Sequence, residues 1–343
     1  MSELTAGKKF IFGSIGLLFS IFIAFLFIEV FVRFYESNYV PKQQGSKKMY
    51  EYDSEIGWKL VDGTYRQLHQ DFDATYIIEN NKRNSFNDDL NGEDRKEVNF
   101  YGDSFCFGTG VDDEFTSSSF FAKLNKNYKI NNHGTSGYGP LQYRLLHNKT
   151  KSDFLNVFLI YTGNDYQDVQ QEKIAWGPYR PILKKENDMY KIVHPKADFR
   201  LIVNEEDKEK FEFRSINFVK NLLKSVPLIV KIRSQFVTPN EDFVNESMNR
   251  FNHIYSDINK ETSLFVIIPS ISLVSGISEN SDEGYFRKNI IEYLKKNHLN
   301  YVDILSKNRV QKEDFWQHEG HNNVVGNEKI GKIITEHLKK QNQ

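Results

Sequence analysis

From Glu97 onward, short apolar runs alternate with segments whose apolar residues recur at helical spacing. Runs such as Val157–Tyr161 and Leu264–Ile268 are bounded by polar or turn residues, which is typical of buried parallel strands. Strands are predicted near residues 97–101, 127–131, 156–162, 263–269 and 299–304, and helices near 116–125, 140–149, 243–259, 284–297 and 326–339. The pattern predicts an α/β fold, a three-layer α/β/α sandwich around a five-stranded parallel sheet with right-handed crossovers.

The N-terminal segment has a different character. No charged residue interrupts Phe10–Ile28, and as a helix this run spans about 28 Å, close to the thickness of a bilayer core. A cleaved signal peptide is the alternative, but the apolar run is long and the residues after it, Val32–Tyr35, are bulky. Residues 10–34 are therefore predicted to be one transmembrane helix that follows a short tail, 1–9.

Two stretches flank or interrupt the predicted core. Residues 35–95 are polar and turn-rich, and are predicted to be a linker or arm that packs on the main domain through Tyr50, Tyr52 and Trp58. Polar residues dominate between Asn80 and Asn91, which predicts a surface loop. The main domain is predicted to span 96–341, with an insertion at 166–238 that five strands do not need.

The insertion contains two strand-like runs, Met189–Val193 and Phe199–Val203, and then a helical pattern over Ile216–Arg233 that Pro227 interrupts. Because it begins directly after Asn164 and Asp165, it is expected to overhang a site there as a lid or substrate wall. Its apolar and basic residues would also suit a membrane surface. A subdomain packed on the sheet is the third interpretation.

Charge and cysteine content limit the function classes. The formal net charge is −1, so no general positive field is available to gather phosphates, which argues against nucleic acid as an obligate partner. The single cysteine, Cys106, excludes an internal disulfide and is interpreted as a small buried hydrophobe rather than a reactive thiol. No metal-ligand spacing is present, and neither a metal nor an organic cofactor is expected.

The segment Val98–Phe105 ends a predicted strand in a Gly-Asp-Ser turn. A serine at the carboxyl end of a central α/β strand, beside a helix start, lies where open parallel sheets place their ligands. Ser104 is therefore the candidate nucleophile. The alternative is that Ser104 or Asp103 only caps the helix.

Three later blocks supply the partners that a serine nucleophile needs, namely residues 132–139, 161–165 and 319–327. With the Gly-Asp-Ser turn, they resemble the SGNH (GDSL-like) hydrolase family, in the family's order along the chain. The resemblance runs from about Glu97 to about Leu338 and leaves a long middle region unmatched. It implies a flavodoxin-like fold and chemistry through an acyl-enzyme on Ser104.

By this resemblance, the oxyanion hole consists of the Ser104 amide, the Gly137 amide and the Asn164 side chain. Gly137 corresponds to the glycine of the family's second block, and Asn164 to the asparagine of its third, whose neutral amide donates without titrating. Gly134 is the rival glycine. Ser136 is a rival nucleophile, but it lacks the Gly-x-Ser-x-Gly spacing of a nucleophile elbow.

His321 resembles the histidine of the last block and is the candidate base, with His318 as its competitor. The family carries aspartate two or three residues before this histidine, whereas here Glu319 and His318 occupy those positions. Either Glu319 completes the catalytic triad, or a backbone carbonyl orients His321, or the activity is reduced. Asp314 is a poorer candidate for the acid, and Asp103 is expected to brace the turn.

The sequence therefore predicts a membrane-anchored serine ester hydrolase acting on acyl esters of envelope glycans or lipids. Lysine and arginine counts around the anchor do not favour an external catalytic domain, so an extracytoplasmic location in a bacterial envelope rests on the resemblance to anchored SGNH proteins and on the short tail. One alternative is an O-acyltransferase that modifies a surface polysaccharide. The other is a catalytically degenerate glycan-binding or scaffold protein.

Overall fold

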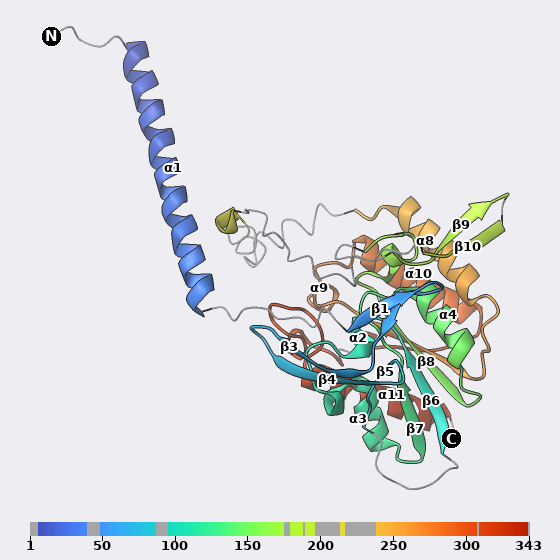
Figure 1. Ribbon diagram of the computed structural model, residues 1–343. Coiled ribbons are helices and arrows are strands. Elements are labelled where there is room, and N and C mark those ends of the chain that lie inside the picture. Colours follow the sequence, from blue (N-terminus) through green and yellow to red (C-terminus); the bar gives the residue numbers. More distant parts are fainter. Residues whose placement is uncertain are drawn as a thin grey trace. The chain divides into compact units, whose positions relative to one another are not determined.

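The computed structural model describes residues 6–39, 49–86, 95–174, 179–187, 189–195, 213–216, 238–306 and 309–341. The chain divides into two compact units. One unit comprises residues 1–42 and 206–235, and the other comprises residues 43–205 and 236–343. Figure 1 labels many of their elements.

The larger unit is built on an eight-stranded sheet of order β12-β11-β8-β6-β7-β5-β4-β3. The predicted five strands are all present and pair in parallel (Figure 1). They are β6 (Lys96–Tyr101), β7 (Tyr128–Asn132), β8 (Leu155–Tyr161), β11 (Ser263–Ile268) and β12 (Asn300–Asp303). The fold class is therefore the predicted α/β sandwich with a mostly parallel sheet.

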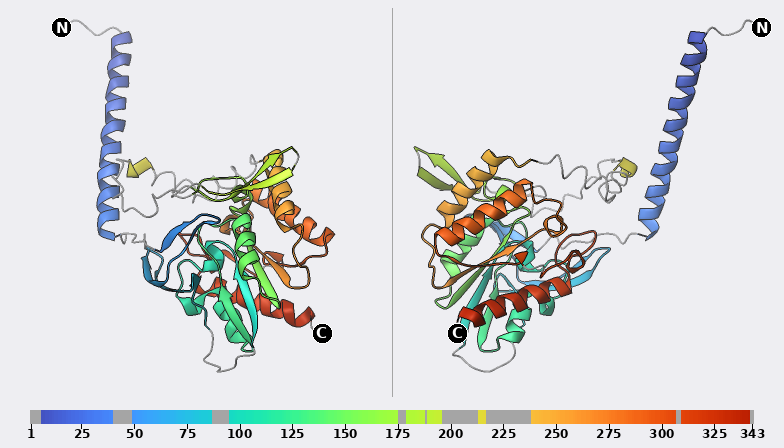
Figure 2. Two further views of the ribbon diagram at one scale, coloured as in Figure 1. Left: turned by 45° about the vertical axis from the view of Figure 1, so that its right-hand side comes forward. Right: turned by 180° about the vertical axis from the view of Figure 1, so that it is seen from behind.

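Helices cover both faces of this sheet, as the two views of Figure 2 show. The long helices are α3 (Ser117–Leu124), α4 (Pro140–Thr150), α8 (Glu241–Tyr255), α10 (Asp282–Lys296) and α11 (Val324–Gln341). Short helices are α2 (Ser104–Phe107), α5 (Asp165–Asp168), α9 (Ile271–Val274) and the 3₁₀ turns η1 (Asp113–Phe115) and η4 (Lys312–Asp314). The five predicted helical patterns correspond to the five long helices.

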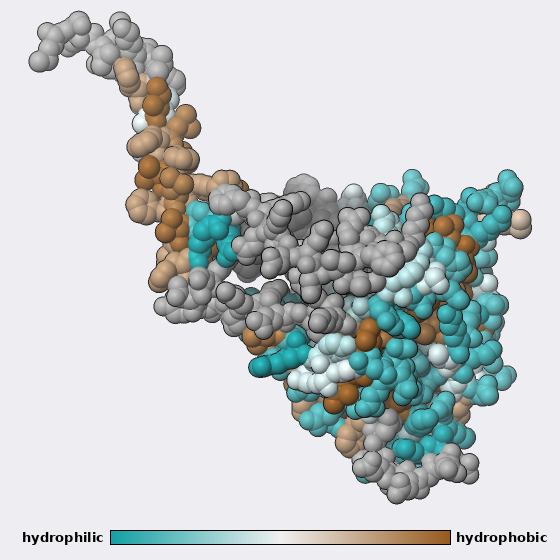
Figure 3. Space-filling model, viewed as in Figure 1, coloured by the Kyte–Doolittle hydropathy of each residue, from teal (hydrophilic) through white to brown (hydrophobic). Residues whose placement is uncertain are grey.

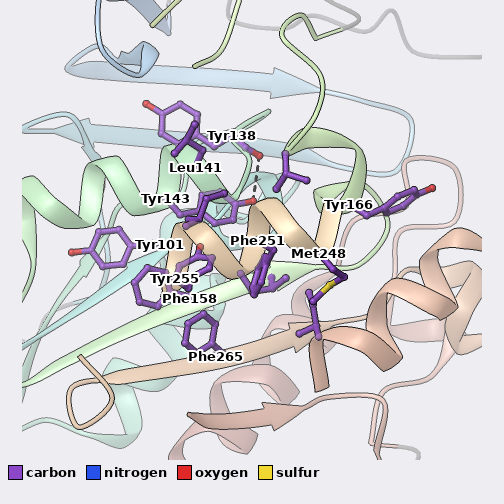
Figure 4. Packing of buried hydrophobic residues seen from close by; sticks show 14 of the residues in the cluster. Tyr101, Tyr138, Leu141, Tyr143, Phe158, Tyr166, Met248, Phe251, Tyr255 and Phe265 are labelled. Atoms are coloured by element: carbon purple, nitrogen blue, oxygen red, sulfur yellow. Dashed lines mark hydrogen bonds between the residues drawn. The ribbon is translucent and has the colours of Figure 1, made fainter. Parts of the chain in front are cut away.

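Strand β8 shows why the core has two sides. Its side chains alternate, so Val157 and Leu159 join the cluster beneath α3 and α11, while Phe158 and Ile160 join the cluster beneath α4, α8 and α10. Figure 4 shows the aromatic packing of the second cluster, in which the Tyr143 hydroxyl donates to the Tyr138 carbonyl at 3.2 Å. Every residue of β8 except the last is buried.

The prediction of a turn-rich arm missed five strands. They are β1 (Tyr50–Asp53), β2 (Gly57–Leu60), β3 (Gly63–Leu68), β4 (Asp73–Glu79) and β5 (Lys82–Arg83). Strands β3 to β5 extend the sheet antiparallel beyond β7. The predicted surface loop is wrong at Lys82–Arg83, because Arg83 is only 1% exposed. Residues 87–91 of that predicted loop lie outside the described residues.

In the insertion, the predicted run Met189–Val193 is strand β10, and it pairs antiparallel with β9 (Ile182–Glu186), which was not predicted. The second predicted run, Phe199–Val203, lies outside the described residues, as does the helical pattern after Ile216. Whether the insertion forms a lid therefore remains a prediction.

The smaller unit contains α1 (Ala6–Tyr39). Within it, Phe12–Tyr35 is long and apolar enough to cross a membrane, and an 18-residue stretch of it has a mean hydropathy of 2.7. Figure 3 shows hydrophobic side chains along the visible face of this helix. Near its end, the Glu29 carboxylate pairs with Arg33 at 2.6 Å and accepts the amide of Ser215 at 2.8 Å.

Candidate active site

The order of the parallel strands brings three of the predicted site residues to one edge of the sheet. Strand β6 lies between β7 and β8, and Ser104, Gly137 and Asn164 follow β6, β7 and β8 respectively. Because parallel strands end at the same edge, the loops that carry these three residues lie side by side. This topology places Ser104 in the central loop.

The turn that carries Ser104 is held by Asp103. The Asp103 carboxylate accepts the Phe105 amide at 2.8 Å and caps the single-turn helix α2, which ends at Gly108 in a left-handed conformation with φ 81°. Burial raises the pKa of Asp103 to about 7. Asp103 therefore braces the turn that carries Ser104, as predicted, and Ser104 is not the residue that caps this helix.

A continuous hydrogen-bonded chain joins Ser104, His321 and Glu319. The Oγ of Ser104 lies 2.6 Å from Nε2 of His321, and Nδ1 of the same ring lies 2.6 Å and 2.7 Å from the two carboxylate oxygens of Glu319. The side chains of His321 and Glu319 are 18% and 17% exposed. This arrangement can take a proton from the serine and stabilise the resulting imidazolium.

Electrostatics keep Glu319 ionised in this position. Burial raises the pKa of its carboxyl group, but the hydrogen bond and the positive charge offered by His321 outweigh burial, so the pKa lies below its ordinary value. The Glu319 carboxylate also accepts the backbone amide of His321 at 3.1 Å. A charged carboxylate held on Nδ1 leaves Nε2 as the nitrogen that faces Ser104.

The rival residues have other partners. His318 pairs with Asp71 at 2.7 Å, and Asp314 pairs with Lys329 at 2.7 Å. The Ser136 hydroxyl contacts Thr109 Oγ1 at 3.5 Å, and no described histidine lies within hydrogen-bonding distance of it. The structure therefore brings His321 and Glu319, rather than the alternatives weighed from sequence, to Ser104.

Gly134 and Gly137 are distinguished by their backbone amides. The Gly134 amide donates to Asn132 Oδ1 at 2.9 Å, and a Cβ at Gly134 would lie 2.3 Å from the Phe107 nitrogen. Gly134 thus lets the loop pack against α2. Gly137 adopts a left-handed conformation with φ 79°, and in the described part of the chain no hydrogen bond occupies its amide.

Arg180 fixes the loop that contains Gly137. Its guanidinium donates to the Gly137 carbonyl at 3.0 Å and pairs with the Asp168 carboxylate. Both side chains are buried, so the pair is shielded from solvent. Arg180 lies in the insertion, and no sequence signal distinguished it from the many surface arginines.

Asn164 follows β8 and begins α5, where its carbonyl accepts the Gln167 amide at 2.8 Å. Its side-chain Oδ1 is buried and has no hydrogen-bond partner among the described residues. The fold leaves this acceptor unused, whereas an oxyanion would be met by the NH₂ group of the same side chain.

Arg83 supports the site but was not predicted to do so from the sequence. This buried guanidinium donates to the carbonyls of Phe107 and Gly108 at 2.7 Å and of Val111 at 2.5 Å, and it pairs with Asp113 at 2.9 Å. It therefore holds the segment that directly follows the Ser104 helix. Strand β5 brings Arg83 there by pairing with both β4 and β7.

The described residues contain no group of three or more histidine, cysteine, aspartate or glutamate side chains arranged to hold a metal ion. Cys106 is fully buried, and burial raises the pKa of its thiol well above the ordinary value. Cys106 is therefore packed as a small hydrophobic residue in the cluster beneath α3 and α11.

No family model and no curated protein matches the chain. Solved structures to which it is similar include a lipolytic protein of the G-D-S-L family from Veillonella parvula, with 10% identity, a TM-score of 0.38 and coverage of 70% of this chain and 96% of that chain. A putative arylesterase from Agrobacterium tumefaciens has 11% identity, a TM-score of 0.39 and coverage of 71% and 99%. A carbohydrate acetylesterase family member from Sinorhizobium meliloti has 10% identity, a TM-score of 0.34 and coverage of 71% and 98%.

Proposed function

We propose that the protein is a membrane-anchored serine ester hydrolase of the SGNH type. The observation that carries this proposal is the unbroken chain from the Ser104 hydroxyl through the His321 ring to the Glu319 carboxylate, with each contact at 2.6 Å. A serine that only caps a helix needs no histidine on its hydroxyl and no carboxylate behind that histidine.

In the proposed reaction, Ser104 Oγ attacks the carbonyl carbon of the ester while its proton moves to Nε2 of His321. The negative charge that develops on the carbonyl oxygen is met by the amides of Ser104 and Gly137 and by the side-chain amide of Asn164. Collapse of this intermediate breaks the bond to the alcohol, which takes the proton from His321. Water then attacks the acyl carbon and gives a proton to His321. The bond to Ser104 Oγ breaks as His321 returns that proton to the serine, and the acid is released.

Glu319 takes the role that aspartate has in the resembling family. Its carboxylate holds Nδ1–H and balances the charge of the imidazolium that forms on proton transfer. Glu319 contacts His321, so the glutamate gives no reason to regard the protein as a catalytically degenerate scaffold.

The anchor and the substrate class extend the proposal. Helix α1 would hold the protein in a bacterial membrane with the catalytic unit on the extracytoplasmic side. Acyl esters of envelope glycans or lipids are the proposed substrates, since an anchored enzyme meets these first. An O-acyltransferase would share the acyl-enzyme and differ only in passing the acyl group to a sugar hydroxyl instead of water.

The test is hydrolysis of p-nitrophenyl acetate by the full chain in detergent. Wild type is expected to show steady turnover, and Ser104→Ala and His321→Ala to lose it. Ser136→Ala is the matched control, because it removes a neighbouring hydroxyl that does not contact His321, and it should retain activity. Turnover that survives in Ser104→Ala would overturn the proposal.

The acceptor is tested in the same preparation. If the enzyme is a hydrolase, all of the acetate should be released as free acid even when a polysaccharide or simple sugar acceptor is added. Acetate recovered on the sugar, in a Ser104-dependent manner, would instead identify the transferase.

A further inference from the structure

The hairpin of β3 and β4 reaches the loop that carries Glu319 and His321. Its turn is closed by two hydrogen bonds between the backbones of His69 and Phe72, at 2.9 Å and 3.3 Å. The Asp71 side chain in this turn is only 8% exposed. A buried carboxylate at the tip of a hairpin needs partners, because burying an unpaired charge is costly.

Apart from His69, whose Nδ1 lies 3.9 Å from Oδ2, the partners of the Asp71 carboxylate belong to the loop before His321. Its Oδ2 accepts the amides of His318 at 2.8 Å and of Glu319 at 3.0 Å, and its Oδ1 lies 2.7 Å from Nδ1 of His318. Burial raises the pKa of Asp71, but the bonds from His318 and Glu319 outweigh burial and leave the pKa below its ordinary value. The carboxylate is therefore ionised and holds two consecutive amides.

The same loop is closed on its other side by its own backbone. The Trp316 amide donates to the His321 carbonyl at 2.8 Å, and the Trp316 ring packs on Phe72 with ring centroids 5.8 Å apart. Gly320 adopts φ 90°, which turns the chain between Glu319 and His321. Asp71 is the charged group that holds the amide of Glu319 itself.

We propose that Asp71 is a positioning residue for the Glu319–His321 pair. By fixing the amides of His318 and Glu319, it sets the direction in which the longer glutamate side chain turns back to Nδ1 of His321. The inference rests on the proposed function of the triad. It assigns to residues 35–95, which were predicted to be a linker or arm packed on the main domain, a part in orienting the base.

The geometry predicts which replacements matter. In Asp71→Asn, one oxygen can still accept both amides and the new NH₂ can donate to His318 Nδ1, so kcat should stay within about 5-fold of wild type. In Asp71→Ala, both amides lose their acceptor, and kcat should fall about 10- to 100-fold with little change in KM. His318→Ala keeps both amides and should stay near wild type.

The decisive experiment is a double-mutant cycle with p-nitrophenyl acetate on the full chain in detergent. If Asp71 acts through Glu319, Asp71→Ala should lower kcat in the wild-type background and have almost no further effect in Glu319→Gln. Asp73→Ala is the matched control, because Asp73 is an exposed carboxylate of the same hairpin whose side chain pairs with Arg66. It should leave kcat unchanged in both backgrounds.

The outcomes separate the two proposals. If Glu319→Gln alone has no effect on kcat, the proposed triad fails. If Glu319→Gln is impaired and Asp71→Ala lowers kcat equally in both backgrounds, the triad stands and the positioning role is wrong. Should Asp71→Ala fail to fold, Asp71→Ser replaces it in the cycle, and failure of both to fold would show that Asp71 serves stability instead.

Discussion

Glu319 contacts His321 although only one residue separates them: both of its carboxylate oxygens lie within 2.7 Å of Nδ1. The chain achieves this through the left-handed Gly320 between them and through the hold of Asp71 on the Glu319 amide. An aspartate in the resembling family makes this contact with a shorter side chain. Here the loop conformation lets the longer glutamate side chain reach Nδ1 of His321.

Replacing Glu319 by glutamine should lower kcat/KM by about 10³-fold or more. The neutral amide preserves size but cannot balance the imidazolium, and it permits the wrong tautomer of His321. The measurement is steady-state hydrolysis of p-nitrophenyl acetate. Activity within a few-fold of wild type would mean that a backbone carbonyl, rather than Glu319, orients the base.

Replacing Glu319 by aspartate should also impair the protein, by about 10- to 100-fold, because the loop positions the carboxyl group for the longer side chain. The same assay checks this. A gain in activity would show that glutamate orients His321 less well than aspartate does. The Glu319–His321 distances of 2.6 Å and 2.7 Å argue against this outcome.

Replacing Arg83 by methionine should destabilise the protein by about 3–5 kcal/mol, because it leaves the partly buried Asp113 without its cation and three carbonyls without a donor. Thermal or denaturant unfolding of the detergent-solubilised chain measures this. The exposed Arg66→Met serves as control and should leave the stability nearly unchanged. Equal effects of the two substitutions would contradict the bracing role.

Replacing Gly134 by alanine should cost about 3 kcal/mol or more, because the new Cβ would lie 2.3 Å from the Phe107 nitrogen and force α2 to move. Gly276→Ala is the control, because a Cβ at Gly276 would meet no atom within 4 Å. Only its φ of 70° disfavours alanine, and the substitution should cost about 1 kcal/mol. A Gly134 variant that is no less stable than the Gly276 variant would refute the close packing of this loop on α2.

Asp103 predicts a dependence of stability on pH. Its folded pKa is raised to about 7, so folding favours the protonated form, and the favourable contribution is present at low pH and lost as pH rises through 7. Asp103→Asn cannot ionise and keeps an acceptor for the Phe105 amide. The melting temperature of Asp103→Asn minus that of wild type should therefore be larger at pH 8 than at pH 5. If this difference did not depend on pH, a neutral Asp103 would be excluded.

The sequence pattern predicted the five parallel strands and the five long helices because both signals are local. Fully buried strands are continuous apolar runs, and amphipathic helices show apolar residues at helical spacing. The prediction missed β4, whose Ala74, Tyr76 and Ile78 alternate with more exposed residues in the manner of a half-buried strand. This alternation is present in the sequence, but the polar, turn-rich residues around it favoured the prediction of an irregular arm.

The supporting residues of the site were beyond local reasoning. The motif blocks indicated Ser104, Gly137, Asn164, His321 and Glu319, whereas Asp71, Arg83 and Arg180 each act on a loop that is remote in sequence. Asp71, for example, is 247 residues from His318. A lone aspartate or arginine carries no pattern, and only the completed sheet brings these charges to the loops that they hold.

The central claim is that Ser104 is an activated nucleophile, and covalent labelling tests it most directly. The detergent-solubilised full chain is treated with a fluorophosphonate, and the modified residue is located by peptide mass spectrometry. We expect one adduct, on Ser104, at a rate that falls sharply in His321→Ala and Glu319→Ala. An adduct elsewhere, or no adduct on a folded chain, would contradict the account.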